Sequence, residues 1–368
     1  MKENEMAERY NFISRDLIRE WSENGERVSW CNPFRKERGK ETLPEDLFYF
    51  DYPYIPGKET IKRYESYMRL TISMLKSGNV SSFRSENVAA RDAVLFQYMR
   101  TPTYHKLDFA HYGKPGDVSY LNRYRGYDFF SEEDDYNLSV GFMKEKILPW
   151  IEELSLSLLD LEPVLLHAPE GKNFILGANP VNVFNPFFEK RFVKYSYAYK
   201  LYDICGAVVV MPVTPSLALC LLDRNIYGMS VKGKDIVLTG NDVDLLNMIQ
   251  LYNADRDGGV VYKGDEEYLY TLTKRLGATP YRDAIMWQKG YAFPFEVSLS
   301  FFEVKDGAQK LLSKFIKNPI RPFVVAMSSY FEGNRKVNSG DNLIEKIQKS
   351  YNYAENILKR LQLLSANS

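Results

Sequence analysis

Cysteine, histidine and net charge are all scarce in this chain of 368 residues. The three cysteines, Cys31, Cys205 and Cys220, are far apart and form no Cys-x-x-Cys pair, which argues against a disulfide framework and a structural zinc site. Lys and Arg number 48, and so do Asp and Glu. This balance argues against a protein that mainly coats nucleic acid or an anionic membrane, but it leaves room for a local basic groove.

Long apolar segments are absent as well. No run approaches the roughly 18 apolar residues that a membrane-spanning helix needs. Residues 1–5 are polar and largely acidic, and they lack the apolar core of a signal peptide. We therefore expect a cytoplasmic protein that does not contact a membrane.

The motifs of familiar catalytic sites are also missing. The chain has no Gly-x-Ser-x-Gly elbow, no Gly-rich phosphate loop and no Gly-x-Gly-x-x-Gly fingerprint. His105 and His111 are six residues apart, wider than zinc ligands on one element usually are, and His167 stands alone at the end of an apolar run. The sequence therefore predicts no metal site and no cofactor.

Aromatic residues are abundant, with 27 Tyr and 22 Phe, and predict a core rich in rings. Apolar residues at steps of three and four predict amphipathic helices at 61–75 and 85–100. A Ser-x-x-acid pattern at Ser131 predicts another helix that runs toward 148. We therefore expect residues 1–160 to form a mainly helical region.

The middle of the chain changes to short apolar runs. They predict strands at 163–167, 174–176, 207–213, 216–222 and 236–238, with a hairpin around 168–172. Later helices are predicted at 241–254 (capped near Asn241), 266–276, 309–316 and 341–364. The pattern indicates an α+β fold with a helical N-terminal third, a central mostly antiparallel sheet and C-terminal helices, in which 161–368 packs with 1–160 as one unit.

Two features of the sequence suggest a polar site. The apolar run 174–176 ends in Gly177-Ala178-Asn179-Pro180, which presents Asn179 at a strand tip, an arrangement that suits a binding site or a turn. In the helix at 241–254, Asn247 and Gln250 lie on one face, and Asn253 and Arg256 follow. Buried amides need partners, and these would form either a polar core network or a ligand site.

Basic residues offer two further candidates. Arg100, at the end of the helix predicted at 85–100, could cap the last carbonyl groups or contact an anion. Arg123, Tyr124 and Arg125 interleave cations with a ring, which suits stacking on bases or packing of the ring with solvated arginines.

Several of these residues together resemble an uncharacterised, mainly bacterial family, the domain of unknown function 4238. The resemblance extends over roughly residues 11–262 and rests on the order of its motifs. The matching positions are Gln97, Arg100-Thr101-Pro102, Phe174-Ile175, Asn179-Pro180-Val181, Met211-Pro212-Val213-Thr214-Pro215, Asn247, Asn253-Ala254 and Arg256.

The chain departs from that family at two places. Asn11 and Ser14 stand where the family has His and Pro, and Gly177-Ala178 stands where it has Ser-Asp before Asn-Pro. If the His and Asp of the family are a catalytic pair, this chain lacks that chemistry; if they are structural, nothing is lost. The resemblance implies no particular substrate, cofactor or reaction.

Together these observations favour a stress- or phage-defence-associated binding protein. Its polar pocket would hold a nucleotide, a nucleic acid or a protein partner. The candidate ligand-binding residues are Arg100, Asn179, Asn247, Arg256, Gln97 and Asn253. The alternatives are a metal-independent hydrolase or nuclease that acts on phosphoesters, and a structural interaction protein that forms oligomers through its C-terminal helix.

Overall fold

The computed structural model of the protein describes residues 8–52, 57–80, 88–101, 151, 155–189, 203–230, 235–254, 259–276, 296–317 and 320–325. The helices predicted from 131 toward 148 and at 341–364 lie outside these residues, as do Arg123, Tyr124, Arg125 and Arg256.

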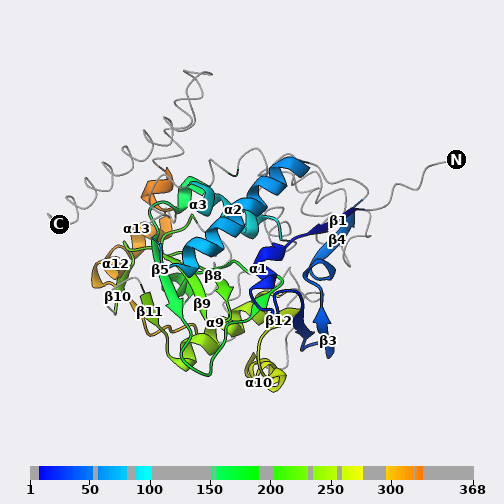
Figure 1. Cartoon of the computed structure of the whole chain (residues 1–368). Helices are drawn as coiled ribbons and strands as arrows, with labels where there is room; N and C mark the ends of the chain where they lie inside the picture. Colours follow the sequence, from blue (N-terminus) through cyan, green and yellow to red (C-terminus); the bar gives the residue numbers. More distant parts are fainter. Residues whose placement is uncertain are drawn as a thin grey trace, which may run out of the picture.

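A five-stranded sheet lies at the centre of the molecule (Figure 1). Across the sheet the strands are β11 (Asp235–Val237), β5 (Glu162–His167), β9 (Leu217–Leu222), β8 (Val208–Thr214) and β7 (Asn182–Phe184). Neighbours run antiparallel, except that β11 and β5 are parallel. All residues of β8 and β9 are buried, which explains their continuous apolar sequences. The α+β class and the mostly antiparallel central sheet are therefore confirmed.

A second, four-stranded sheet joins the start of the chain to much later residues. Its order is β3 (Glu37–Thr42), β2 (Val28–Asn32), β12 (Val260–Tyr262) and β6 (Leu176–Gly177), all antiparallel. Cys31 on β2 lies opposite Val260 on β12. Local periodicity does not reveal this pairing, because the two central strands come from distant parts of the sequence.

The helical N-terminal third that the sequence predicts is not clearly shown, because the described residues begin with strands. β1 (Glu8–Asn11) pairs antiparallel with β4 (Tyr49–Tyr52), and in the described part of the chain four strands precede the first long helix. These strands are short, and their sequences show too little alternation to predict a sheet. The short helix α1 (Arg15–Arg19) lies between β1 and β2.

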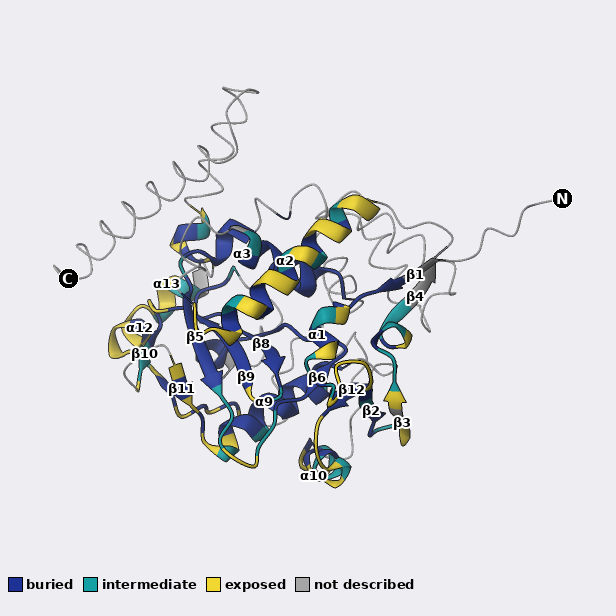
Figure 2. Ribbon diagram, in the orientation of Figure 1, coloured by how far each residue is buried: buried dark blue, intermediate teal, exposed yellow. Residues whose placement is uncertain are grey.

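The two helices predicted next are confirmed. α2 covers Lys58–Lys76 and α3 covers Val88–Met99. They pack against each other (Figure 1), and the rings of Tyr64 and Phe96 stack with 4.7 Å between their centroids. The outward face of α2 is exposed (Figure 2), so its apolar stripe faces the interior.

The hairpin predicted around residues 168–172 is wrong. β5 belongs to the five-stranded sheet and β6 to the four-stranded sheet. The segment between β5 and β6 instead lies against the turn that connects β8 to β9. The Ala168 amide donates to the Ser216 carbonyl at 2.9 Å, and the Phe174 amide donates to the Pro215 carbonyl at 2.7 Å. The two apolar runs are therefore strands of different sheets.

The helix α9 (Gly240–Asn253) is buried on almost all sides (Figure 2). Its cap is Thr239, two residues before the predicted position. The Thr239 hydroxyl accepts from the Asp242 amide at 3.2 Å, and the Asp242 carboxylate accepts from the Thr239 amide at 3.0 Å. This reciprocal pair satisfies backbone donors that a helix start leaves open.

The remaining elements are short. α10 covers Glu266–Leu276 as predicted, whereas α12 (Asp306–Lys310) and α13 (Leu312–Lys317) replace the single helix predicted at 309–316. Strands β10 (Tyr227–Met229) and β13 (Phe302–Val304) pair antiparallel. The others are η1 (Pro44–Asp46), η4 (Leu156–Leu158) and α8 (Pro186–Glu189).

The three cysteines are buried and form no disulfide. Burial raises the pKa of the Cys31 thiol to about 12, and it also raises the pKa of Cys205 and Cys220. Thiols in such surroundings are poor nucleophiles. In the part of the chain that the structure describes, no helix has the length and apolar character needed to span a membrane.

A buried ion pair fastens residues 320–325 to the body of the protein. The Arg321 Nε donates to both carboxylate oxygens of Asp160, at 3.1 and 3.0 Å, and Arg321 Nη2 donates to the Ser157 carbonyl. Both charged side chains are almost completely inaccessible. Burial raises the pKa of Asp160 to about 6, although Arg321 opposes the shift and Asp223 supports it.

Replacing Arg321 with Met retains side-chain volume but leaves the Asp160 carboxylate without its cation. Breaking a buried pair in this way costs about 3–5 kcal/mol, so we expect a clearly lower urea midpoint for R321M. R69M is the control, because Arg69 forms a surface pair with Asp16 that contributes at most about 1 kcal/mol. Equal midpoints for the two variants would contradict the prediction.

Candidate functional site

Arg100 and Gln97, two of the predicted ligand-binding residues, lie one turn apart at the end of α3 and are buried. Both reach the same backbone oxygen: the Phe12 carbonyl accepts from Gln97 Nε2 at 2.9 Å and from Arg100 Nε at 3.0 Å. Gln97 Oε1 in turn accepts from the Ser14 amide at 3.0 Å. Residues 12–14, which lie between β1 and α1, are thereby fixed to α3.

Glu65, on α2, completes this cluster. One of its carboxylate oxygens pairs with Arg100 Nη1, and the other accepts from the Ser14 hydroxyl at 2.6 Å. The Arg100 side chain is 1% exposed and that of Glu65 is 29% exposed. Glu65 therefore connects the buried guanidinium to solvent.

One nitrogen of the Arg100 guanidinium has an unused donor. Nη2 is buried and has no hydrogen-bond partner among the residues that the structure describes. The guanidinium carbon lies 5.1 Å from the centre of the Phe96 ring and 6.0 Å from that of Tyr10, close enough for cation–π attraction, but these rings provide no acceptor oxygen for Nη2. An unpaired buried donor on a charged group is costly and uncommon, so Nη2 is an unsatisfied polar atom within this cluster.

The amides of α9 form a second network, which we call the amide ladder: Asn247, Gln250 and Asn253. Asn247 Oδ1 accepts from the Ile175 amide at 3.0 Å, and its Nδ2 donates to the Asn173 carbonyl at 2.8 Å. One turn later, Gln250 bonds the backbone of segment 173–182 at two further positions.

Gln250 Oε1 accepts from the Gly177 amide at 2.9 Å, and its Nε2 donates to the Pro180 carbonyl at 2.9 Å. Gly177 permits this contact, because a Cβ there would lie 2.9 Å from both the Gln250 carbonyl oxygen and Oε1. A Ser in place of Gly177 would collide with α9. The glycine at the position where the resembled family has Ser is therefore required by packing in this chain.

Asn179, the residue at the predicted strand tip, belongs to the end of the ladder. Its side chain donates to the Asn253 carbonyl, and the Asn253 side chain donates to Asn182 Oδ1. A cavity of about 10 Å³ lies beside Asn182, Asn247 and Gln250. That space suits roughly one water molecule, whereas pockets for drug-sized ligands occupy at least about 300 Å³.

The structure thus divides the predicted site residues between two networks. Asn247 and Asn253 belong to the amide ladder, and Asn179 bonds its last residue. Arg100 and Gln97 lie in the cluster around Glu65. Asn247 and Gln250 bond the backbone of the chain itself, and the Asn253 amide bonds the Asn182 side chain. These contacts form a polar core network, one of the two alternatives that the sequence left open.

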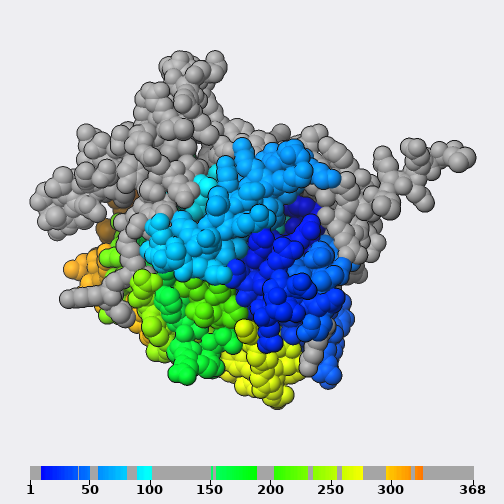
Figure 3. Space-filling view, viewed as in Figure 1, coloured from blue at the N-terminus to red at the C-terminus, as the bar shows by residue number. Residues whose placement is uncertain are grey.

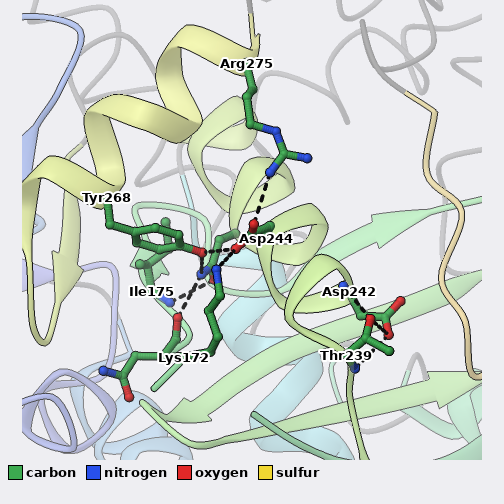
Figure 4. A network of polar contacts seen from close by, with 9 residues as sticks. Lys172, Ile175, Thr239, Asp242, Asp244, Tyr268 and Arg275 are labelled. Carbon is green, nitrogen blue, oxygen red and sulfur yellow. Dashed lines mark hydrogen bonds and ion pairs between the residues drawn. The ribbon is translucent and has the colours of Figure 1, made fainter. Parts of the chain in front are cut away.

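A third cluster, shown in Figure 4, was not predicted from the sequence. Asp244 Oδ1 accepts from Lys172 Nζ at 2.8 Å and from the Tyr268 hydroxyl at 2.7 Å, while Asp244 Oδ2 accepts from Arg275 Nη1 at 3.1 Å. Burial raises the pKa of Tyr268, and its bond to Asp244 raises it further. We call these four residues the Asp244 cluster.

Two signals for the unpredicted residues are present in the sequence. Tyr268 and Arg275 are seven residues apart, which places them on one face of α10. Glu65 directly follows Tyr64 in the buried stripe of α2, so a charge adjoins that stripe. Neither signal identifies the partner, because each partner lies on another element.

The fold and these networks define an α+β protein with a buried central helix, a five-stranded sheet, a four-stranded sheet built from distant parts of the chain, and a partly exposed arginine–glutamate cluster. The family described as "Protein of unknown function (DUF4238)" matches residues 12–266, well over half of the chain. The chain belongs to this family, as its motifs predicted. Neither the curated proteins nor the solved structures give a match to this chain.

The amide ladder generates a test of stability. Replacing Gln250 with Met keeps the side-chain length but leaves the buried Gly177 amide and Pro180 carbonyl without their partner. An unsatisfied buried group costs about 1–3 kcal/mol, so Q250M should lose roughly 2–6 kcal/mol of unfolding free energy. Urea unfolding of Q250M and of Q309M, whose side chain is exposed on α12, provides the comparison. Similar losses in both variants would refute a structural role for the ladder.

Proposed function

We propose that the protein binds a phosphate-bearing ligand through Arg100, in the cluster that Arg100 forms with Glu65 and Ser14. The unpaired Nη2 of Arg100 is the observation that supports the proposal. A guanidinium presents its donors in a planar fork that matches phosphate oxygens, and here two of its three nitrogens are already fixed by Phe12 and Glu65. The ligand would meet a donor that is oriented in advance.

Nucleotides and nucleic acids are the ligands that carry such groups, in agreement with the sequence-based hypothesis. Glu65 opposes them, because its carboxylate neutralises Arg100. A phosphate oxygen that approaches Nη2 gains a charge-assisted hydrogen bond but meets the negative charge of Glu65. Affinity at this site should therefore depend on the charge at position 65.

Phosphoester hydrolysis is the second candidate function. The observation that favours it is the 2.6 Å hydrogen bond between the Ser14 hydroxyl and Glu65, which pairs a nucleophile with a carboxylate base beside an arginine. Such an enzyme would lose cleavage of labelled RNA and DNA when Ser14 is replaced with Ala. Binding without Ser14-dependent cleavage favours the binding protein.

The broader parts of the proposal concern the setting of the protein. We infer a cytoplasmic bacterial protein associated with stress or phage defence. A structural interaction protein is the remaining alternative, with oligomers formed through residues 341–368. Deleting those residues and measuring the oligomeric mass tests that alternative, and an unchanged mass removes it.

Replacing Glu65 with Gln gives the sharpest test, because it removes the opposing charge and keeps the side-chain shape. We expect E65Q to bind labelled single-stranded RNA or DNA roughly tenfold more tightly than wild type, about 1.4 kcal/mol. R100K, which loses the planar fork, should bind more weakly. Fluorescence anisotropy measures both.

The matched control is E59Q. Glu59 lies on the same helix and is also paired with a cation, Lys62, but its side chain is 85% exposed. E59Q should bind like wild type. If E65Q and R100K also bind like wild type, or if no variant binds either nucleic acid, the proposal fails.

A further inference from the structure

The Asp244 cluster brings together charged side chains from three separate segments. Lys172 lies between β5 and β6, Asp244 lies on α9, and Tyr268 and Arg275 lie on α10 (Figure 4). The α10 residues form a surface corner of the molecule in Figure 3. The Lys172 and Arg275 side chains are 33% and 41% exposed, whereas Asp244 is 16% exposed. The two cations are therefore the accessible members.

The charges within the cluster do not cancel. Two cations share one carboxylate, which leaves a local charge of +1. Lys172 donates one of its three ammonium N–H groups to Asp244, and Arg275 donates one of its five guanidinium N–H groups to the same carboxylate. The carboxylate already accepts three hydrogen bonds, and the remaining donors of the two partly exposed cations are accessible to an added acceptor.

The packing around the cluster holds the cations in place. Lys172 Nζ lies 4.9 Å from the centre of the Tyr268 ring. Asn247 Nδ2 donates to the Tyr268 hydroxyl at 3.0 Å, which ties the cluster to the amide ladder. The Lys172 stem lies at the start of α9, because its Cε is 3.3 Å from the position of a Cβ on Gly240.

We propose that Lys172 and Arg275 form a second anion site, separate from Arg100, that binds a phosphate group. A lysine supplies a point charge and an arginine a planar fork, and together they suit a tetrahedral oxyanion. Asp244 acts as the internal counter-ion that keeps both cations near each other when no ligand is bound. Because a phosphodiester carries one negative charge, it would neutralise the local +1 completely.

Protection of Lys172 from acetylation tests the proposal on the full-length protein. The protein is treated with an acetylating reagent with and without inorganic phosphate, at equal ionic strength, and each lysine is quantified by mass spectrometry. At phosphate concentrations ten times the dissociation constant, acetylation of Lys172 should slow about tenfold. Lys76 is the internal control, since it pairs with Glu20 at the same 2.8 Å and is 50% exposed.

The variant R275Q shows whether phosphate protects Lys172 by binding at this site or by lowering lysine acetylation in some other way. It leaves the Lys172–Asp244 pair intact and should abolish protection by phosphate. A short RNA in a separate arm distinguishes a phosphodiester source from inorganic phosphate. If phosphate and RNA protect Lys172 no more than Lys76, or if protection persists in R275Q, the proposal is wrong. R275Q should leave the Glu65-dependent change in affinity at Arg100 intact, so the two sites are tested independently.

Discussion

Side-chain amides take the place of a neighbouring strand at two positions in this protein. Asn247 binds the carbonyl of Asn173 and the amide of Ile175, and Gln97 binds the carbonyl of Phe12 and the amide of Ser14. In each case one amide takes the C=O of residue i and the N–H of residue i+2, as one residue of a parallel strand would. Apart from the half-buried Asn173, these bonded residues are buried. Their backbone groups need partners that, among the described residues, no strand supplies at these positions.

This arrangement also orders the surroundings of both proposed anion sites. Gln97 fixes the Phe12 carbonyl, which in turn accepts from Arg100 Nε and orients the guanidinium. Asn247 donates to the Tyr268 hydroxyl, which donates to Asp244. In one cluster the helix amide, Gln97, therefore shares the Phe12 carbonyl with Arg100. In the other, Asn247 bonds the hydroxyl that donates to Asp244. The buried pair of Arg321 and Asp160, by contrast, has a structural role at another place in the fold.

The sequence predicted the elements whose own residues determine them. Helix 266–276 has acidic residues in its first turn and Lys274 and Arg275 in its last, and the strands at 208–214 and 217–222 are continuous apolar runs. It did not predict how the strands before α2 pair or that β5 and β6 belong to separate sheets, because those features depend on distant partners. Arg100, Gln97 and Asn247 were identified as site candidates, but Glu65, which lies 35 residues before Arg100, was not. The sequence indicates which side chains need partners and does not specify which partners they find.

Gly177 also determines which residues of segment 173–182 lie opposite which residues of α9. Within segment 173–182, the Asn247 and Gln250 amides contact only main-chain groups. Such groups are the same at every residue except proline, so those contacts alone could be satisfied after a shift along the chain. The spacings of the two partners also differ. The three residues from Asn247 to Gln250 rise about 4.5 Å along the helix, whereas the two residues from Ile175 to Gly177 advance about 6.6 Å along an extended chain. The missing side chain at Gly177 admits Gln250 at that position. The position of this glycine in the sequence therefore fixes the alignment of segment 173–182 on α9, although the backbone groups that α9 binds are the same in other alignments.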